Sequence, residues 1–255
     1  MRAISKGLLA AVAVVLGGCG IVWAQGEPAC GTASALVSAD FSLPKVAAAI
    51  AGKKLTITVI GTGSSTLGPP AGPEKAYPAR LEAALAQKLP GVAVTVVPHV
   101  KMRELSREAV PQFPKFLQAD KPALTIWQTG TVEAVRGVDP DTFRDWLDQG
   151  IDTIQAAKSD IVLMNMQYSP RTEMMISLSP YSDAIRFVAL QREILLFDRF
   201  AIMRRWGELN TFDLNEATKK TDTAARVHDC IGRLLSDLVL EGAGVQASSG
   251  NNSHK

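Results

Sequence analysis

Residues 55–68 read Leu-Thr-Ile-Thr-Val-Ile-Gly-Thr-Gly-Ser-Ser-Thr-Leu-Gly. The first six are all leucine or β-branched residues, which favours a buried β-strand that ends at Gly61. The glycine, serine and threonine residues that follow favour a tight turn. The stretch therefore predicts a strand that presents hydroxyl groups at one edge of a sheet.

The rest of the chain alternates predicted strands with predicted helices. The strands span 92–97, 123–127, 161–164 and 195–197, and the helices span 77–89, 104–117, 141–157 and about 223–240. We expect Pro98 to end the second strand, and Pro111 and Pro114 to interrupt the helix that contains them. The alternation predicts a three-layer α/β/α domain with a parallel five-stranded sheet. In such sheets the functional crevice lies beyond the carboxyl ends of the strands.

Length and composition limit the class of protein. A chain of 255 residues suits one domain, which we place at residues 52–241, between an N-terminal arm at 25–51 and a disordered tail at 242–255. The net charge of +2 and the aromatic content of 6% give no indication of a nucleic-acid partner.

The N-terminus has the pattern of an export signal. Residues 1–24 contain Arg2 and Lys6, followed by an apolar run shorter than the roughly 20 residues of a spanning helix. Cleavage after Ala24 predicts a periplasmic or secreted protein. A lipobox-like sequence ending at Cys19 predicts instead a lipid anchor in the bacterial envelope.

Two cysteines, Cys30 and Cys230, remain after either processing step. In an exported protein such a pair favours a disulfide, which here would tie the N-terminal arm to the last helix. The alternative is a pair of buried, unpaired thiols.

The loop after the first strand has more than one interpretation. A dinucleotide-binding fingerprint needs a third glycine where Thr66 stands, and no acidic residue closes the second strand. A P-loop is excluded because no Gly-Lys-Ser/Thr follows. A serine on such a turn would act as a nucleophile with backbone N–H groups beside it. A loop that only caps the next helix remains the alternative.

Several motifs together resemble the SGNH, or GDSL-type, serine ester hydrolases, and more narrowly a bacterial exported subgroup. The matching segments are 62–68, 77–83, 127–131, 167–171 and 199–204, so that the similarity covers about residues 50–240. The resemblance implies a flavodoxin-like fold and hydrolysis of acyl esters. The sequence has no cofactor motif and no spacing of ligands for a metal.

The resemblance assigns Ser64 as the nucleophile, with Ser65 as the alternative register and Gly63 in place of the family's aspartate. The family's glycine after the second strand is missing, because residues 100–103 read Val-Lys-Met-Arg. Arg171, after the fourth strand, is a candidate contact for an anionic or sugar ligand.

The family's third block, Gly-x-Asn-Asp, is only half present. Gly130 and Thr131 match it and would help the Ser64 N–H to bind the oxyanion. Val132 stands at the asparagine and Glu133 at the aspartate, and valine cannot donate a hydrogen bond.

Two registers compete for the family's Asp-x-x-His. In one, His228 is the histidine, but Ala225 stands three residues upstream where the aspartate belongs. In the other, Asp222 takes the place of the histidine and Lys219 that of the aspartate. His99, which follows the second strand, is a further candidate base.

Two functions are therefore compatible with the sequence. One is an exported hydrolase of a small acyl ester or acylated carbohydrate, such as an envelope glycan, with weak or lost activity. The other is a pseudoenzyme that binds a glycan or envelope partner in the same crevice. The oligomeric state cannot be derived from the sequence.

Overall fold

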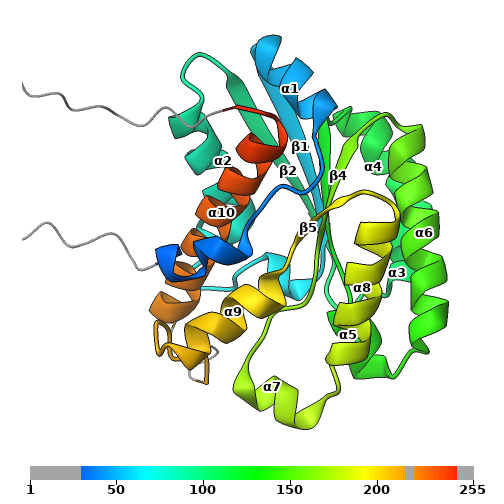
Figure 1. Ribbon diagram of the computed structural model, residues 1–255, viewed down its shortest axis with the longest axis vertical. Helices are drawn as coiled ribbons and strands as arrows, with labels where there is room; N and C mark the ends of the chain where they lie inside the picture. The colour runs from blue at the N-terminus through cyan, green and yellow to red at the C-terminus, as the bar shows by residue number, and fades with distance from the viewer. Residues whose placement is uncertain (1–29, 216–220, 246–255) are drawn as a thin grey trace, which may run out of the picture.

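The computed structural model describes residues 30–215 and 221–245 and contains a parallel sheet with the strand order β2-β1-β3-β4-β5 (Figure 1). The strands are β1 (Lys54–Gly61), β2 (Ala93–Val100), β3 (Leu124–Gln128), β4 (Asp160–Met164) and β5 (Leu195–Phe197). All residues of β3 are buried, as expected for a central strand covered on both faces. The predicted α/β class with a five-stranded sheet is confirmed.

Helices cover both faces of the sheet (Figure 1). One face carries α1 (Pro44–Ala51), α2 (Tyr77–Lys88) and α10 (Thr221–Gly242), with α9 (Arg199–Glu208) beside them. The other face carries α4 (Phe113–Asp120), α6 (Pro140–Ala156) and α8 (Ser179–Gln191). The short elements are η1 (Cys30–Leu36), η2 (Gly63–Ser65), η3 (Pro73–Lys75), α3 (Ser106–Ala109), η4 (Val110–Gln112), α5 (Thr131–Arg136) and α7 (Pro170–Met175).

The expectation that Pro98 ends the second strand is wrong, because β2 continues to Val100. The Ala93 N–H donates to the carbonyl oxygen of Lys53, directly before β1, and the Lys101 N–H donates to that of Gly61 at its end. Alternate residues of a parallel strand face the same neighbour. Residue 98 therefore turns its nitrogen outward. Since β2 is the edge strand, the missing proline N–H costs no ladder hydrogen bond.

The two other prolines act as predicted. The region around them is divided into α3, the 3₁₀ turn η4 at Val110–Gln112, and α4, so that no continuous helix spans 104–117.

The N-terminal segment is joined to the last helix by a disulfide between Cys30 and Cys230, whose Cα atoms lie 5.2 Å apart. The predicted pairing is confirmed. Leu43 and Val46 of this segment are buried, and the Leu43 N–H donates to the Gly242 carbonyl oxygen at 2.7 Å. Residues 30–51 thus pack as part of the domain. None of the helices in the described ranges is long and apolar enough to cross a membrane.

Candidate active site

Ser64 lies on a tight turn that begins where β1 ends. Thr62 is extended, and the turn itself is η2. Gly61 permits the close return of the chain, because a Cβ at this position would lie 2.2 Å from the Ser65 Oγ. Ser65 is 1% exposed, whereas Ser64 lines a surface crevice. The turn therefore brings Ser64 to the crevice and buries the alternative serine.

The Ser64 hydroxyl donates to an amide oxygen. Gln128, the last residue of β3, is buried, and its Oε1 accepts from the Ser64 Oγ at 3.1 Å and from the Ser65 Oγ at 3.0 Å. The Thr62 N–H donates to the same oxygen at 3.1 Å. An amide oxygen accepts a hydrogen bond but does not take the proton, unlike an imidazole or a carboxylate. Gln128 therefore orients Ser64 without activating it.

A buried arginine lies beneath the turn. Arg199 is 1% exposed and donates from Nη1 to the Ser64 carbonyl oxygen at 2.9 Å. Its guanidinium lies 5.7 Å from the centre of the Tyr77 ring, and its Nε has no partner within the described residues. Burial lowers the pKa of Arg199 to about 10, and Tyr77 partly offsets this effect. The Ser64 peptide is thus held against a desolvated positive charge.

His228 contacts Tyr77 and makes no hydrogen bond to Ser64. The Nδ1 of His228 accepts from the Tyr77 N–H at 2.9 Å. Burial, and next the charge of Arg199, lower the pKa of His228 to about 3. The imidazole is therefore neutral at pH 7, and its lone pair on Nδ1 is already engaged. This geometry gives no support to His228 as the general base.

The other candidate bases also lie apart from Ser64. The Nε2 of His99 bonds to the Asp120 Oδ2 at 2.7 Å. Asp222 is exposed in the first turn of α10, and Lys219 lies outside the described residues. Within residues 30–215 and 221–245, no imidazole or carboxylate hydrogen-bonds to the Ser64 hydroxyl.

The corner after β3 determines which groups can bind an oxyanion. Gly130 has a φ of +98°, and a Cβ there would lie 2.6 Å from the Met166 Sδ. Its N–H donates to the Glu133 Oε2 at 3.1 Å and is not free. Among the described residues, the Ser64 N–H has no hydrogen-bond partner, and neither have the Gln128 Nε2 and the Thr131 Oγ1, both of which are buried. The Ser64 N–H is therefore an available oxyanion donor, whereas the two buried side-chain groups could reach an oxyanion only after a shift.

Glu133 joins this corner to the loop after β2. It is 1% exposed, and its Oε1 accepts from the Ser106 N–H at 2.6 Å and from the Ser106 Oγ at 2.8 Å. Glu133→Gln would place an NH₂ group against buried donors. We expect it to lower the free energy of unfolding, measured by urea denaturation, by about 2–3 kcal/mol.

The matched control for that substitution is Glu108→Gln. Glu108 is exposed and accepts one N–H, that of Leu105, at 3.1 Å. We expect this control to cost less than about 1 kcal/mol, as is usual for surface positions. Equal losses in the two variants would contradict the structural role of Glu133.

The crevice at Ser64 lies where the strand order reverses, between β1 and β3, and has a volume of about 520 Å³. Its lining comes from the ends of the strands and the loops that follow them: Thr62, Gly63, Ser64, Met102, Arg103, Thr131, Val132, Val135, Arg136 and Gln167. This is the sheet edge that the strand pattern predicts. In the described part of the chain, no group of histidine, cysteine, aspartate and glutamate residues could hold a metal ion.

The crevice brings together only part of the predicted set. Gly63 and Thr131 line it with Ser64, whereas Gly130 is not among the lining residues. Arg171 is exposed on α7 and is not a lining residue either. Their functional roles stay predictions.

Four residues of the site were not singled out from the sequence: Gln128, Arg199, Arg103 and Arg136. Partial signals existed. Gln128 directly follows the third predicted strand, and Arg199 begins one of the family-like motifs. A polar residue at the carboxyl end of a central strand is a candidate in its own right.

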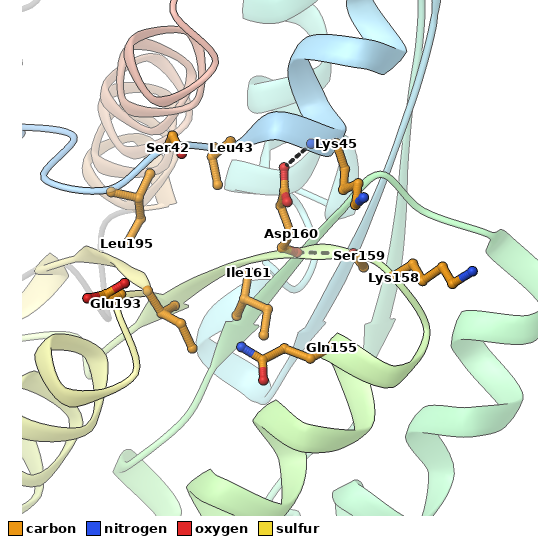
Figure 2. Close-up of a pocket in the computed structure, with 11 residues that line it drawn as sticks. Ser42, Leu43, Lys45, Gln155, Lys158, Ser159, Asp160, Ile161, Glu193 and Leu195 are labelled. Atoms are coloured by element: carbon orange, nitrogen blue, oxygen red, sulfur yellow. Dashed lines mark hydrogen bonds between the residues drawn. The ribbon is translucent and has the colours of Figure 1, made fainter.

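A second hollow, of about 500 Å³, lies at the amino ends of β4 and β5, whereas the Ser64 crevice lies at the carboxyl ends of the strands (Figure 2). Its carboxylate, Asp160, accepts the Lys45 N–H at 2.7 Å and the Val46 N–H at 3.0 Å. Burial raises the pKa of Asp160, and these two N–H groups partly offset the rise. Figure 2 shows Gln155 and Lys158 extending away from this carboxylate. Asp160 therefore serves the first turn of α1.

A serine on a sharp turn at the switch point of a doubly wound parallel sheet is the arrangement that the resemblance to SGNH-type serine ester hydrolases implies. The resemblance inferred from the motifs is confirmed. Residues 29–245 match the model of the non-GDSL lipase-like family, and the chain belongs to that family.

Solved structures show the same fold. TesA superposes with a TM-score of 0.58 at 20% identity, covering 72% of this chain and 99% of TesA. The esterase EstA from Pseudoalteromonas sp. gives 0.56 at 16%, covering 72% and 96%. Axe2, an acetylxylan esterase from Geobacillus stearothermophilus, gives 0.56 at 18%, covering 75% and 95%. No curated protein matches the chain in sequence.

Proposed function

We propose that this protein is an exported acyl-ester hydrolase with weak activity, acting on a small acyl ester or an acylated carbohydrate at Ser64. The observation that carries the proposal is the state of the Ser64 hydroxyl. Ser64 lines a crevice, its own N–H has no partner among the described residues, and its hydroxyl donates to the Gln128 amide oxygen. Positioning is therefore present, and a proton acceptor is absent among the described residues.

The chemistry follows from these groups. The Ser64 oxygen attacks the acyl carbon, its proton passes to water, and the oxyanion accepts the Ser64 N–H. The bond to the alcohol then breaks, and the leaving alkoxide takes a proton from water. A second water attacks the acyl-serine, which releases the carboxylic acid and returns a proton to the Ser64 oxygen. Serine hydrolases that lose a triad member keep about 10³–10⁴-fold acceleration over water, from oxyanion binding and positioning alone. We expect turnover in that range.

Substrate and location belong to the same proposal. The apolar start of residues 1–24 supports export, and the lipobox-like Cys19 keeps a lipid-anchored form open. Axe2 is an acetylxylan esterase, which supports an acylated glycan as substrate here. Among acylated glycans, a polysaccharide of the cell envelope is the substrate that an exported protein would meet.

A fluorophosphonate probe, read by mass spectrometry, tests the nucleophile. We expect slow labelling that disappears in Ser64→Ala, because Ser64 lines the crevice and its N–H has no partner among the described residues. Labelling should persist in the matched control Ser65→Ala, since Ser65 is buried. Loss of the label in Ser65→Ala alone would move the nucleophile to the other register.

The binding-only pseudoenzyme is the second candidate, and the acceptor Gln128 specifically favours it. Complete absence of labelling, together with no hydrolysis of p-nitrophenyl acetate above the rate in buffer, would replace the hydrolase by this alternative.

A further inference from the structure

The crevice carries positive charge that no protein carboxylate neutralises. Arg103 and Arg136 line it together with Ser64, and its lining includes no aspartate or glutamate. Neither arginine forms an ion pair within residues 30–215 and 221–245. By contrast, the neighbouring Lys101 pairs with Glu104 at 2.8 Å. The two guanidinium groups therefore remain available to a ligand.

Arg103 occupies a backbone conformation that glycine adopts more readily than arginine. Its φ is +60°, in the left-handed region that glycine adopts without strain. The family pattern has a glycine in this loop, which would be the less strained choice. Five other described non-glycine residues share this region, so it is the place of Arg103 in the crevice lining that indicates a use for its side chain.

The same crevice has an apolar part. Met102 and Val135 line it, although they are 65% and 57% exposed. Met102 lies directly against the nucleophile turn, because a Cβ on Gly63 would be 2.7 Å from its Sδ. Exposed apolar side chains of this size suit the hydrocarbon of an acyl group.

We propose that the crevice selects esters whose alcohol part carries a carboxylate or a phosphate. Arg103 and Arg136 bind the anion, since guanidinium groups match both oxyanions with paired hydrogen bonds. Met102 and Val135 contact the acyl group. This selectivity rests on the proposed function at Ser64.

Isothermal titration calorimetry with matched ligands tests the selectivity. The ligands are 4-acetoxybenzoate, its uncharged counterpart methyl 4-acetoxybenzoate, and 4-acetoxyphenyl phosphate, each titrated into the Ser64→Ala protein to prevent turnover. We expect at least one anionic ester to bind about tenfold more tightly than the methyl ester at low salt. The advantage should shrink at about 0.5 M salt, because the arginines are exposed. The tighter anion identifies the carboxylate or the phosphate as the natural group.

Variants separate the two arginines from net charge. Arg103→Gln/Arg136→Gln should abolish the preference, and Arg103→Lys/Arg136→Lys should keep part of it. The control Lys54→Gln/Lys121→Gln removes the same charge from exposed positions at the opposite edge of the sheet and should leave the preference intact. All these side chains are exposed, so thermal melts should confirm unchanged folding.

Equal binding of the methyl ester and both anions would overturn the proposal. It would also be overturned if the control Lys54→Gln/Lys121→Gln lost the preference as fully as Arg103→Gln/Arg136→Gln. The outcome is distinct from that of the probe experiment. An anion preference without labelling of Ser64 would retain this selectivity and remove hydrolysis. Labelling of Ser64 without any anion preference would retain hydrolysis and remove this selectivity.

Discussion

The His228→Asn variant will lose the acid sensitivity that His228 imposes on the wild-type protein. Burial and Arg199 lower the pKa of His228 from 6.5 to about 3 in the folded state, so the unfolded chain takes up a proton that the folded chain refuses. Stability is therefore full above pH 6.5 and falls as the pH drops towards about 3. Each pH unit in this window removes about 1.4 kcal/mol from the free energy of unfolding.

Urea denaturation at pH 7.5, 6, 5 and 4 would measure this difference. The side-chain amide oxygen introduced by His228→Asn can still accept the Tyr77 N–H, but the stacking of the imidazole on Tyr77 is lost. We therefore expect the variant to be less stable at pH 7.5 and to approach the wild type as the pH falls. Parallel curves for the two proteins would show that folding does not lower the pKa of His228.

The same residue bears on catalysis. A general base titrates near the pH at which the enzyme works, whereas a buried histidine with a pKa of about 3 stays neutral there. Labelling of Ser64 by the fluorophosphonate probe should therefore persist in His228→Asn. A loss of labelling with the fold intact would restore His228 as a candidate base.

Local pattern was sufficient for the sheet. The β-branched run at β1 and the buried residues of β3 and β4 reflect strands covered on both faces, and this environment leaves a strong signal in composition. Helices α8 and α9 were not predicted from the sequence, although they span 13 and 10 residues. The short helices α5 and α7 were also missed, because one or two turns show little periodicity. Helix α1 escaped because its alanine-rich sequence has a weak pattern.

The chemistry of the site depends on contacts that no local pattern encodes. Gln128, at the end of β3, accepts from Ser64 in the turn after the neighbouring strand β1. Arg199, on a helix 135 residues further along the sequence, donates to the Ser64 carbonyl oxygen. His228 shows the same limit from the other side. One register of the family motif makes His228 the base. Its surroundings, Tyr77 and Arg199, keep the imidazole neutral and its Nδ1 hydrogen-bonded, and the sequence does not show these contacts.

Loss of the Cys30–Cys230 disulfide is expected to lower the free energy of unfolding by about as much as the full acid effect at His228. The bond joins residues that are 200 positions apart. On the chain-entropy account, a cross-link closing so long a loop stabilises the fold by about 5 kcal/mol, because it restricts the unfolded chain. Cys230→Ala should therefore lower the melting temperature by about 10–20 °C, a shift measurable by calorimetry under non-reducing conditions.

A double-mutant cycle separates the cross-link from local packing. Cys30 is 8% exposed and Cys230 is fully buried, so simple loss of side-chain volume would cost different amounts at the two sites, and these costs would add. Loss of the cross-link instead predicts nearly equal effects in Cys30→Ala, Cys230→Ala and the double variant. Additive losses in the double variant would mean that the sulfur atoms stabilise the fold by packing. Nearly equal losses would mean that η1 is held on α10 mainly by the covalent bond, which an oxidising compartment maintains.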